Sequence, residues 1–155
     1  MCGAVVERIR LNLPRSTSGV FIADAPYGVP DEFHIFKTNV RNSGEWKPFF
    51  ESYGGHHMER DDTGFVVGPE EMFELFLYLR RKNKVSVGVF HTHKLLPAIF
   101  TDIDRDLHSD PDLWHLVVSV LDVQRPELRA YCVDGGSVHE VEINYIEDEM
   151  REERR

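Results

Sequence analysis

Short runs of apolar residues alternate with polar, glycine- and proline-rich stretches along this chain, and the apolar spacing predicts both strands and helices. The clearest run is 85–93, in which β-branched residues lead into two histidines, and it predicts a central strand. Shorter runs predict further strands at 19–23, 33–42, 64–67, 115–121, 128–133 and 138–145. Between the last two runs, Asp134-Gly135-Gly136 predicts a hairpin turn.

Residues 69–82 have the pattern of an amphipathic helix. Pro69 stands in the first turn, where a missing N–H costs nothing, and acidic residues near the start and basic residues near the end complement the helix dipole. One apolar stripe on this helix is expected to lie against the sheet: Met72, Phe73, Phe76 and Leu79. A shorter helix is expected over 101–108, with Thr101 as its N-cap.

Size and composition narrow the class of protein. A chain of 155 residues with 41% hydrophobic and 29% charged residues is typical of one soluble globular domain. We expect this domain to span 1–146 and to be followed by a charged tail over 147–155. The net charge of −9 argues against non-specific nucleic-acid binding, which needs a basic surface.

No apolar run approaches the roughly 20 residues that span a bilayer, and the N-terminus has no signal-peptide pattern, so we expect a cytoplasmic protein without membrane contact. Cys2 and Cys132 are far apart in sequence and are interpreted as free thiols.

Candidate chemistry begins at the end of the run 85–93. Side chains two residues apart on a strand point the same way, so His91 and His93 share a face. A loop and the first turn of the helix after Thr101 can then bring the carboxylate of Asp104 over both imidazoles. Two histidines and a carboxylate with an open fourth position are what a catalytic zinc site needs.

Each of these residues also has a purely structural interpretation. The histidines can be a polar pair at an exposed strand end, and Thr101 with Asp104 fits a capping box, in which both side chains bond backbone N–H groups. Taken alone, the Thr-x-x-Asp pair favours the cap. In combination with both histidines, it favours a metal site.

His-x-His, seven residues, Ser or Thr, two residues and Asp together resemble the JAMM (MPN+) metalloprotease motif, here His91, His93, Thr101 and Asp104. The resemblance runs from about 13 to about 146. It implies an α/β fold, with a mixed, mostly antiparallel sheet flanked by helices, as in the cytidine deaminase fold. It also favours a helix for residues 1–13, whose apolar spacing fits a helix and a strand equally well.

The resemblance implies one Zn²⁺ per chain, bound by His91, His93 and Asp104, with a water whose pKa falls from about 16 to near 7. Thr101 would donate to the developing oxyanion, as the family's Ser does. The family also uses a Glu three residues before the Gly that opens the first apolar strand. Here that Gly is Gly19, and Ser16 stands at the position of the Glu.

Serine cannot act as a general base at neutral pH without an activating partner, and general acid–base catalysis is worth about 10²- to 10⁴-fold. Three explanations stay open at this point. The alignment of this stretch can be wrong, another acid can act instead (Glu7, Glu32 or Glu45), or the protein binds metal and partner but cuts slowly or not at all.

The function implied by resemblance is a zinc-dependent peptidase or isopeptidase that acts at the C-terminus of a ubiquitin-like or sulfur-carrier protein. The alternative is an MPN-like protein-binding module, inactive or weakly active, that keeps the metal site. A zinc deaminase is disfavoured because that chemistry needs a His/Cys/Cys set, which Cys2 and Cys132 do not supply.

The stretch 43–62 has no clear periodicity and is longer than most loops inside a domain. Its aromatic residues are interpreted as a satellite core, with a docking surface for a substrate tail as the functional alternative: Phe49, Phe50 and Tyr53. His56 and His57 are adjacent and predict polar surface. The remaining histidines have no ligand spacing and are not assigned to the site: His34, His108, His115 and His139.

Overall fold

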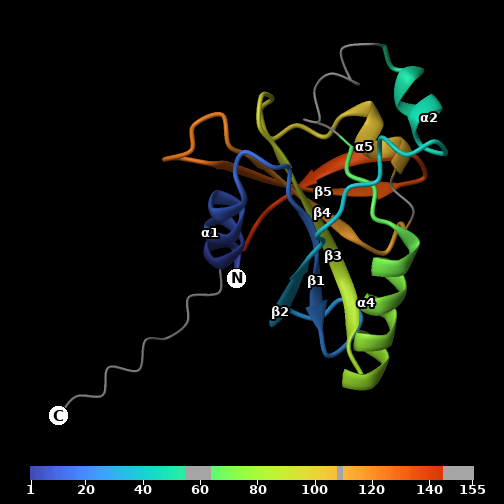
Figure 1. Ribbon diagram of the computed structural model, residues 1–155. Helices are drawn as coiled ribbons and strands as arrows, with labels where there is room; N and C mark the ends of the chain where they lie inside the picture. The colour runs from blue at the N-terminus through green and yellow to red at the C-terminus, as the bar shows by residue number, and fades with distance from the viewer. Residues whose placement is uncertain (55–63, 108–109, 145–155) are drawn as a thin grey trace.

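The computed structural model describes residues 1–54, 64–107 and 110–144. Six strands form one sheet in the order β2-β1-β3-β4-β5-β6 (Figure 1). The strands are β1 (Ser18–Ala23), β2 (Glu32–Ile35), β3 (Val85–His93), β4 (Trp114–Ser119), β5 (Glu127–Asp134) and β6 (Ser137–Val141). The helices are α1 (Cys2–Asn12), α2 (Lys47–Glu51), α4 (Pro69–Lys82) and α5 (Asp102–Leu107).

Neighbouring strands run antiparallel except β3 and β4, which are parallel. The structure therefore confirms the expected α/β class and the mixed, mostly antiparallel sheet. The helix expected at the N-terminus is present as α1, and the strand expected over 85–93 is present as β3, in the middle of the sheet. The tail expected over 147–155 lies outside the described residues.

Helices α1 and α4 cover opposite faces of the sheet (Figure 1). On one face, Val5 and Ile9 of α1 are buried against Phe21 of β1. On the other face, Leu75 of α4 packs against Val20 of β1. This division follows from the strand itself, because successive side chains of β1 point to opposite faces.

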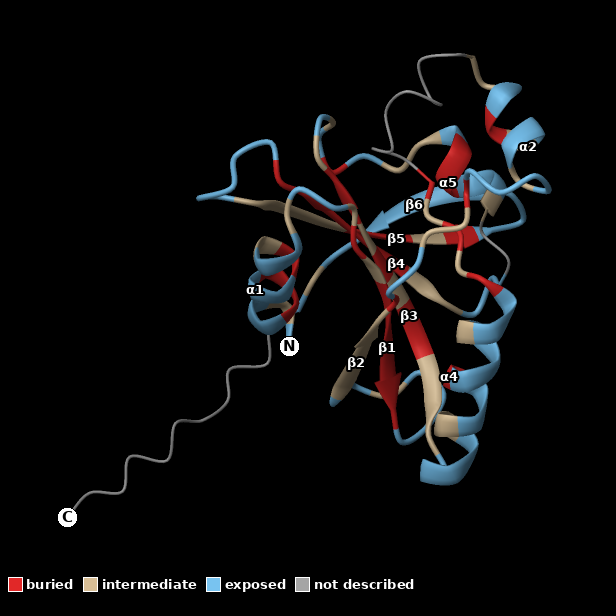
Figure 2. Cartoon of the chain, in the orientation of Figure 1, coloured by how far each residue is buried: buried red, intermediate tan, exposed pale blue. Residues whose placement is uncertain are grey.

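Helix α4 has the predicted bounds, but of its predicted stripe only Leu79 faces the sheet, and the prediction was wrong for Met72, Phe73 and Phe76. The side chains that face the sheet are Leu75, which is buried, with Tyr78 and Leu79 partly buried beside it. Phe73 and Phe76 are instead exposed. Figure 2 shows that most of α4 is exposed on its outward side. Both sets recur at helical spacing, so sequence periodicity alone did not decide which set faces the sheet.

A β-bulge in β3 determines which face its histidines occupy. Phe21 of β1 pairs with Gly88, but the next residue, Ile22, pairs with Ser86, so Val87 is the extra residue. Val87 packs in the cluster under α1, whereas Val89 packs in the cluster under α4. A bulge shifts the alternation by one residue, so the odd-numbered positions after it point toward α4 and α5.

The C-terminal hairpin is formed as predicted. Asp134 of β5 pairs with Ser137 of β6, and the two glycines between them have positive φ angles of 54° and 81°. Glycine adopts such angles without steric cost, which is why this dipeptide predicts a two-residue turn.

The stretch 43–62 is described as far as residue 54 and contains the short helix α2, which was not predicted. Phe50 is buried with Ile103 of α5, and Phe49 and Tyr53 pack against this cluster, which confirms the expected satellite core. Tyr53 also donates a hydrogen bond to Asp106, which raises the pKa of Tyr53 to about 12. The aromatic cluster of α2 therefore packs against α5 through Ile103. The predictions for His56, His57 and His108 lie outside the described residues.

Three expected strands differ clearly from their predicted ranges. The last one, expected over 138–145, ends at Val141 as β6. The run 33–42 forms only the four-residue β2, and 64–67 contributes a single bridge between Asn39 and Val67. Cys2 and Cys132 are free, as predicted. Among the described residues, no helix is both long enough and apolar enough to cross a membrane.

Candidate metal centre

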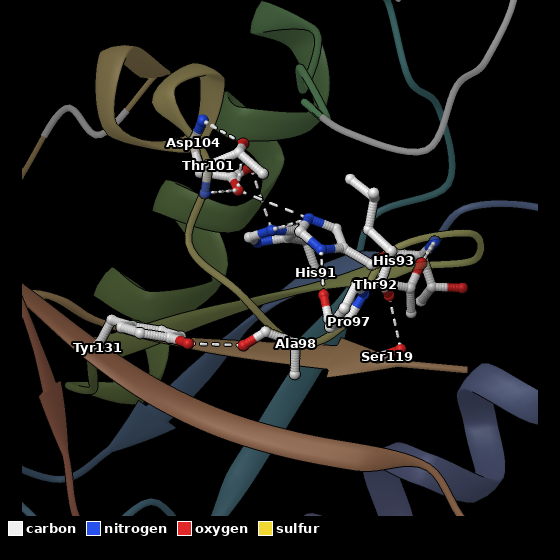
Figure 3. Close-up of polar contacts among 11 residues, drawn as sticks. His91, Thr92, His93, Pro97, Ala98, Thr101, Asp104, Ser119 and Tyr131 are labelled. Atoms are coloured by element: carbon white, nitrogen blue, oxygen red, sulfur yellow. Dashed lines mark hydrogen bonds and ion pairs between the residues drawn. The ribbon is translucent and has the colours of Figure 1, made fainter. Parts of the chain in front are cut away.

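The last residues of β3 and the first turn of α5 bring three side chains together (Figure 3). The Nε2 atom of His91 lies 3.2 Å from Oδ1 of Asp104, and Nε2 of His93 lies 3.5 Å from Oδ2. The two Nε2 atoms are 3.3 Å apart. The side chain of His91 is 12% exposed, and those of His93 and Asp104 are 0% and 3% exposed. The arrangement is therefore a small, nearly closed polar site.

The tautomer of His93 follows from its backbone contact. Nδ1 of His93 lies 3.0 Å from the carbonyl oxygen of Pro97. A carbonyl oxygen only accepts hydrogen bonds, so Nδ1 carries a proton, and the neutral ring then presents the lone pair of Nε2 to Asp104 and His91. Such a contact to the second ring nitrogen is the usual way in which proteins orient a histidine metal ligand.

This donor set fits a divalent metal ion. One ligand atom from each of His91, His93 and Asp104 lies within 4.8 Å of the others. Lone pairs that converge in a buried space repel each other unless a proton or a cation lies among them. The group can therefore hold a metal ion, and imidazole with carboxylate suits zinc among other divalent ions.

Asp104 is also part of a helix cap. The N–H and the hydroxyl of Thr101 donate to Oδ2 of Asp104 at 2.8 and 2.7 Å, and the N–H of Asp104 donates back to the Thr101 hydroxyl at 3.2 Å. The capping box expected for Thr101 and Asp104 is thus formed. It does not compete with the metal site, because the cap uses Oδ2 and leaves Oδ1 facing His91.

The pKa of the Asp104 carboxyl reflects two opposed effects. Burial raises it, but the imidazoles, when protonated on the nitrogens that face Asp104, outweigh burial through the charge of His91 and the hydrogen bonds of His91 and His93, and they hold the pKa well below its usual range. Asp104 is therefore a carboxylate at neutral pH, which is the form that binds a metal.

Side chains from the sheet hold the loop that joins the histidines to α5. The hydroxyl of Ser119 on β4 donates to the Leu96 carbonyl at 2.7 Å. On β5, Glu127 accepts the N–H of Ala98 at 3.2 Å, and the Tyr131 hydroxyl donates to the Ala98 carbonyl at 2.6 Å. The bond from Ala98 is the main reason why the pKa of Glu127 is lowered. The loop is thereby bonded at three successive residues, Pro97 included, and sequence spacing gave no sign of this.

Ser16 lies beside β3, the strand that carries His91 and His93. In the β1–β3 ladder Ser18 pairs with His91, and the N–H of Thr92 donates to the carbonyl of Thr17 at 3.0 Å. Continued by one residue, this antiparallel register puts Ser16 opposite His93. Ser16 therefore lies at the end of β3 that carries the two histidines.

The three alternative acids lie in different places. Glu7 is on α1, across the sheet, and pairs with Arg10 at 2.6 Å. Glu32 pairs with Ile22 at the far end of β1 and is bonded to Lys84. Glu45 is exposed in the turn before α2. Only Glu45 adjoins a residue, Trp46, that lines the cavity described next.

A cavity of about 410 Å³ extends from the site between α4 and the sheet. Its wall includes His91, Asp104 and Trp46, together with Ser18 of β1. His115, which sequence reasoning did not assign to the site, also lines it and packs edge-on against Phe100. Its pairing with Val89, two residues before His91, brings it there, and no local pattern could have indicated this.

Comparison with known proteins supports a peptidase assignment. The chain is 29% identical over 147 residues to the CysO-cysteine peptidase of Mycobacterium tuberculosis, covering 95% of this chain and 88% of the relative. The protein of the same name from Mycobacterium bovis matches equally well. No protein-family model matches the chain.

Two solution structures share the fold. A protein from Desulfitobacterium hafniense has a TM-score of 0.68 at 21% identity, covering 92% of this chain and 86% of the other. A protein from Salinibacter ruber has a TM-score of 0.56 at 18% identity, covering 94% and 90%. At these identities the likeness concerns the fold alone.

Proposed function

We propose that this protein is a metal-dependent peptidase of the JAMM (MPN+) type. Its substrate class is a ubiquitin-like or sulfur-carrier protein, and the bond cleaved is the peptide or isopeptide bond at that protein's C-terminus. The observation that carries the proposal is the convergence of His91, His93 and Asp104. The similarity to the CysO-cysteine peptidases supports both the reaction type and a protein substrate.

In this proposal His91, His93 and Asp104 hold one Zn²⁺. A bound zinc ion supplies a Lewis acid that polarises the scissile carbonyl and lowers the pKa of a water molecule. The carbonyl of Pro97 keeps the proton on Nδ1 of His93, and the capping bonds of Thr101 keep the Asp104 carboxylate over the histidines.

The proposed role of Thr101 is to donate its hydroxyl proton to the developing oxyanion. A hydroxyl has one proton, and here it is donated to Oδ2 of Asp104. Rotation of the hydroxyl about the Cβ–Oγ1 bond would redirect that proton toward the substrate. Thr101 would therefore exchange one bond of the cap for a bond to the carbonyl oxygen.

A second function has its own support. By resemblance to the family, Ser16 corresponds to its catalytic Glu, and the register of β1 with β3, continued past Ser18, puts Ser16 opposite His93. A serine there supplies no carboxylate to move protons between water and the leaving amine. This favours an MPN-like protein-binding module that keeps the metal site and cleaves weakly or not at all.

Metal content and cleavage, measured on the same preparation, test the proposal. Protein purified without a chelator or an affinity tag is expected to carry about one zinc per chain by mass spectrometry, as one three-ligand site predicts. It is then incubated with a sulfur-carrier or ubiquitin-like protein extended beyond its C-terminus, and intact mass reports cleavage.

The peptidase is supported if the wild type carries zinc and cleaves the substrate, and if His91→Ala loses both the zinc and the cleavage. The protein-binding module is supported if the wild type carries zinc and binds the carrier protein but does not cleave it. A protein that stays metal-free when zinc is supplied contradicts both proposals. His139→Ala is the matched control, because His139 lies on β6, paired with Cys132 and away from the site.

A further inference from the structure

The outer face of α4 carries an exposed apolar patch. Phe73 is 60% exposed, Phe76 55% and Leu77 41%, and Met72 on the flank is 46% exposed. The rings of Phe73 and Phe76 stack with centroids 6.5 Å apart. Adjacent large apolar side chains of this kind on a soluble protein mark an interaction surface more often than chance exposure does.

Charged residues flank this patch in two blocks of opposite sign. Glu70 and Glu74 lie on the first half of the helix, and Arg80 and Arg81 lie on the second half. With Leu77 between them, their spacing of three and four residues puts them on one face. All four are exposed, and none forms an ion pair with another residue of the described part of the chain.

We propose that this face of α4 is a homodimer interface, in which two copies pair their α4 helices antiparallel about a two-fold axis. Such an axis brings the same surface of both copies together, so the surface must complement itself. Antiparallel pairing sets Glu70 and Glu74 of each copy against Arg81 and Arg80 of the other, around a centre formed by Phe73 and Leu77. Parallel pairing would oppose like charges.

The size of the surface indicates a concentration-dependent dimer. A helix of 14 residues is about 21 Å long, and one helix pair buries less than the roughly 1,200 Å² of a standard stable interface. The opposite face of α4 packs on the sheet through Leu75, Tyr78 and Leu79. The proposed interface therefore contains none of His91, His93 and Asp104, and it does not depend on a bound metal.

Sedimentation velocity over a range of concentrations of the full chain tests the interface. The wild type is expected to shift from monomer to dimer, and Leu77→Glu is expected to weaken association at least about tenfold, because it places a charge at the centre. Leu11→Glu is the control, since Leu11 is 76% exposed on α1. A wild type that is monomeric at all concentrations, or equal weakening by both variants, overturns the proposal.

A charge exchange tests orientation and partner together. Glu70→Arg and Arg81→Glu are each expected to weaken the dimer by opposing like charges, and the double variant is expected to regain association. Circular dichroism establishes that each variant is folded. A double variant no stronger than the singles overturns the antiparallel pairing, because only a second copy of the same chain supplies both exchanged charges.

Discussion

The hydroxyl of Tyr131 on β5 donates a 2.6 Å hydrogen bond to the carbonyl oxygen of Ala98, three residues before Thr101. This bond links β5, two strands away from β3 in the sheet, to the loop between the two histidines and Asp104. The Tyr131 hydroxyl bonds to the backbone of the loop and not to the three converging side chains. It acts on them through the position of the loop.

Replacement of Tyr131 by Phe should therefore lower metal affinity. The ring stays, the bond to Ala98 is lost, and the loop gains freedom. Outer contacts of this type are worth about 10- to 100-fold in metal affinity, and we expect a loss of about tenfold by competition with a zinc indicator. The control is Tyr78→Phe, which removes a bond to Glu32 at the other end of the sheet. Equal losses in both variants would refute the positioning role.

Asp104→Asn should separate the cap from the metal site. An amide oxygen can still accept the N–H of Thr101, so we expect the free energy of unfolding to change by only about 1 kcal/mol. The negative charge is lost, and zinc affinity should fall at least about a hundredfold. Calorimetric titration of the metal-free wild type and the metal-free Asp104→Asn variant with zinc measures the two affinities. Asp106→Asn, on the same helix, should bind zinc normally, and unchanged zinc binding in Asp104→Asn would refute its role as a ligand.

Ser16→Glu should increase cleavage. The carboxylate would stand opposite His93, at the position that the JAMM resemblance implies for a general base. If the proposed function holds, we expect a rise in kcat of about tenfold or more, out of the 10²- to 10⁴-fold available. Ser16→Gln has nearly the same shape without a titratable group and should show no rise. If Glu and Gln behave alike, the missing acid is not what limits this chain.

Thr101→Val removes the hydroxyl and nearly keeps the shape. The cap loses the bond to Oδ2 and the acceptor for the N–H of Asp104, which should cost about 1 kcal/mol of stability. If the hydroxyl also serves the oxyanion, kcat should fall about 10²-fold with little change in KM. Thr101→Ser should restore both. A variant that loses stability but keeps kcat would show that Thr101 is only a cap.

Stability should fall in acid partly through Lys84, whose ammonium group lies 2.6 Å from Asp31 and 3.1 Å from Glu32. The bond with Lys84 lowers the pKa of Asp31, and bonds with Tyr78 and Lys84 lower that of Glu32. Because both pKa values are lower in the folded state, this contribution is complete above the unfolded values near 4 and is lost below them.

Thermal unfolding between pH 7 and 3 measures this contribution. Lys84→Met should lower Tm at pH 7 and flatten its fall toward pH 3. Lys37→Met is the control, since the Lys37 side chain is exposed and its ammonium group has no ion pair among the residues the structure describes. A slope in Lys84→Met equal to that of the wild type would refute the assignment.

Local sequence was enough to predict the elements that hold the site. Pro69 and the charged ends of the following segment predicted α4 with its observed bounds, and the run ending in His91 and His93 predicted β3. Thr101 and Asp104 predicted the first turn of α5, where both now bond each other. These features depend on contacts within a few residues, which a sequence records directly.

Only the tertiary structure decided which faces these elements present. The histidines point toward α4 and α5 because Val87 is an extra residue opposite β1, and pairing between distant strands determines that bulge. The same holds for Leu75, which faces the sheet where Phe73 was expected. The loop between β3 and α5 is held by side chains from strands that follow it in the chain, namely Ser119, Glu127 and Tyr131. Each of these contacts joins segments whose proximity exists only after the sheet has formed, since no local spacing encodes it.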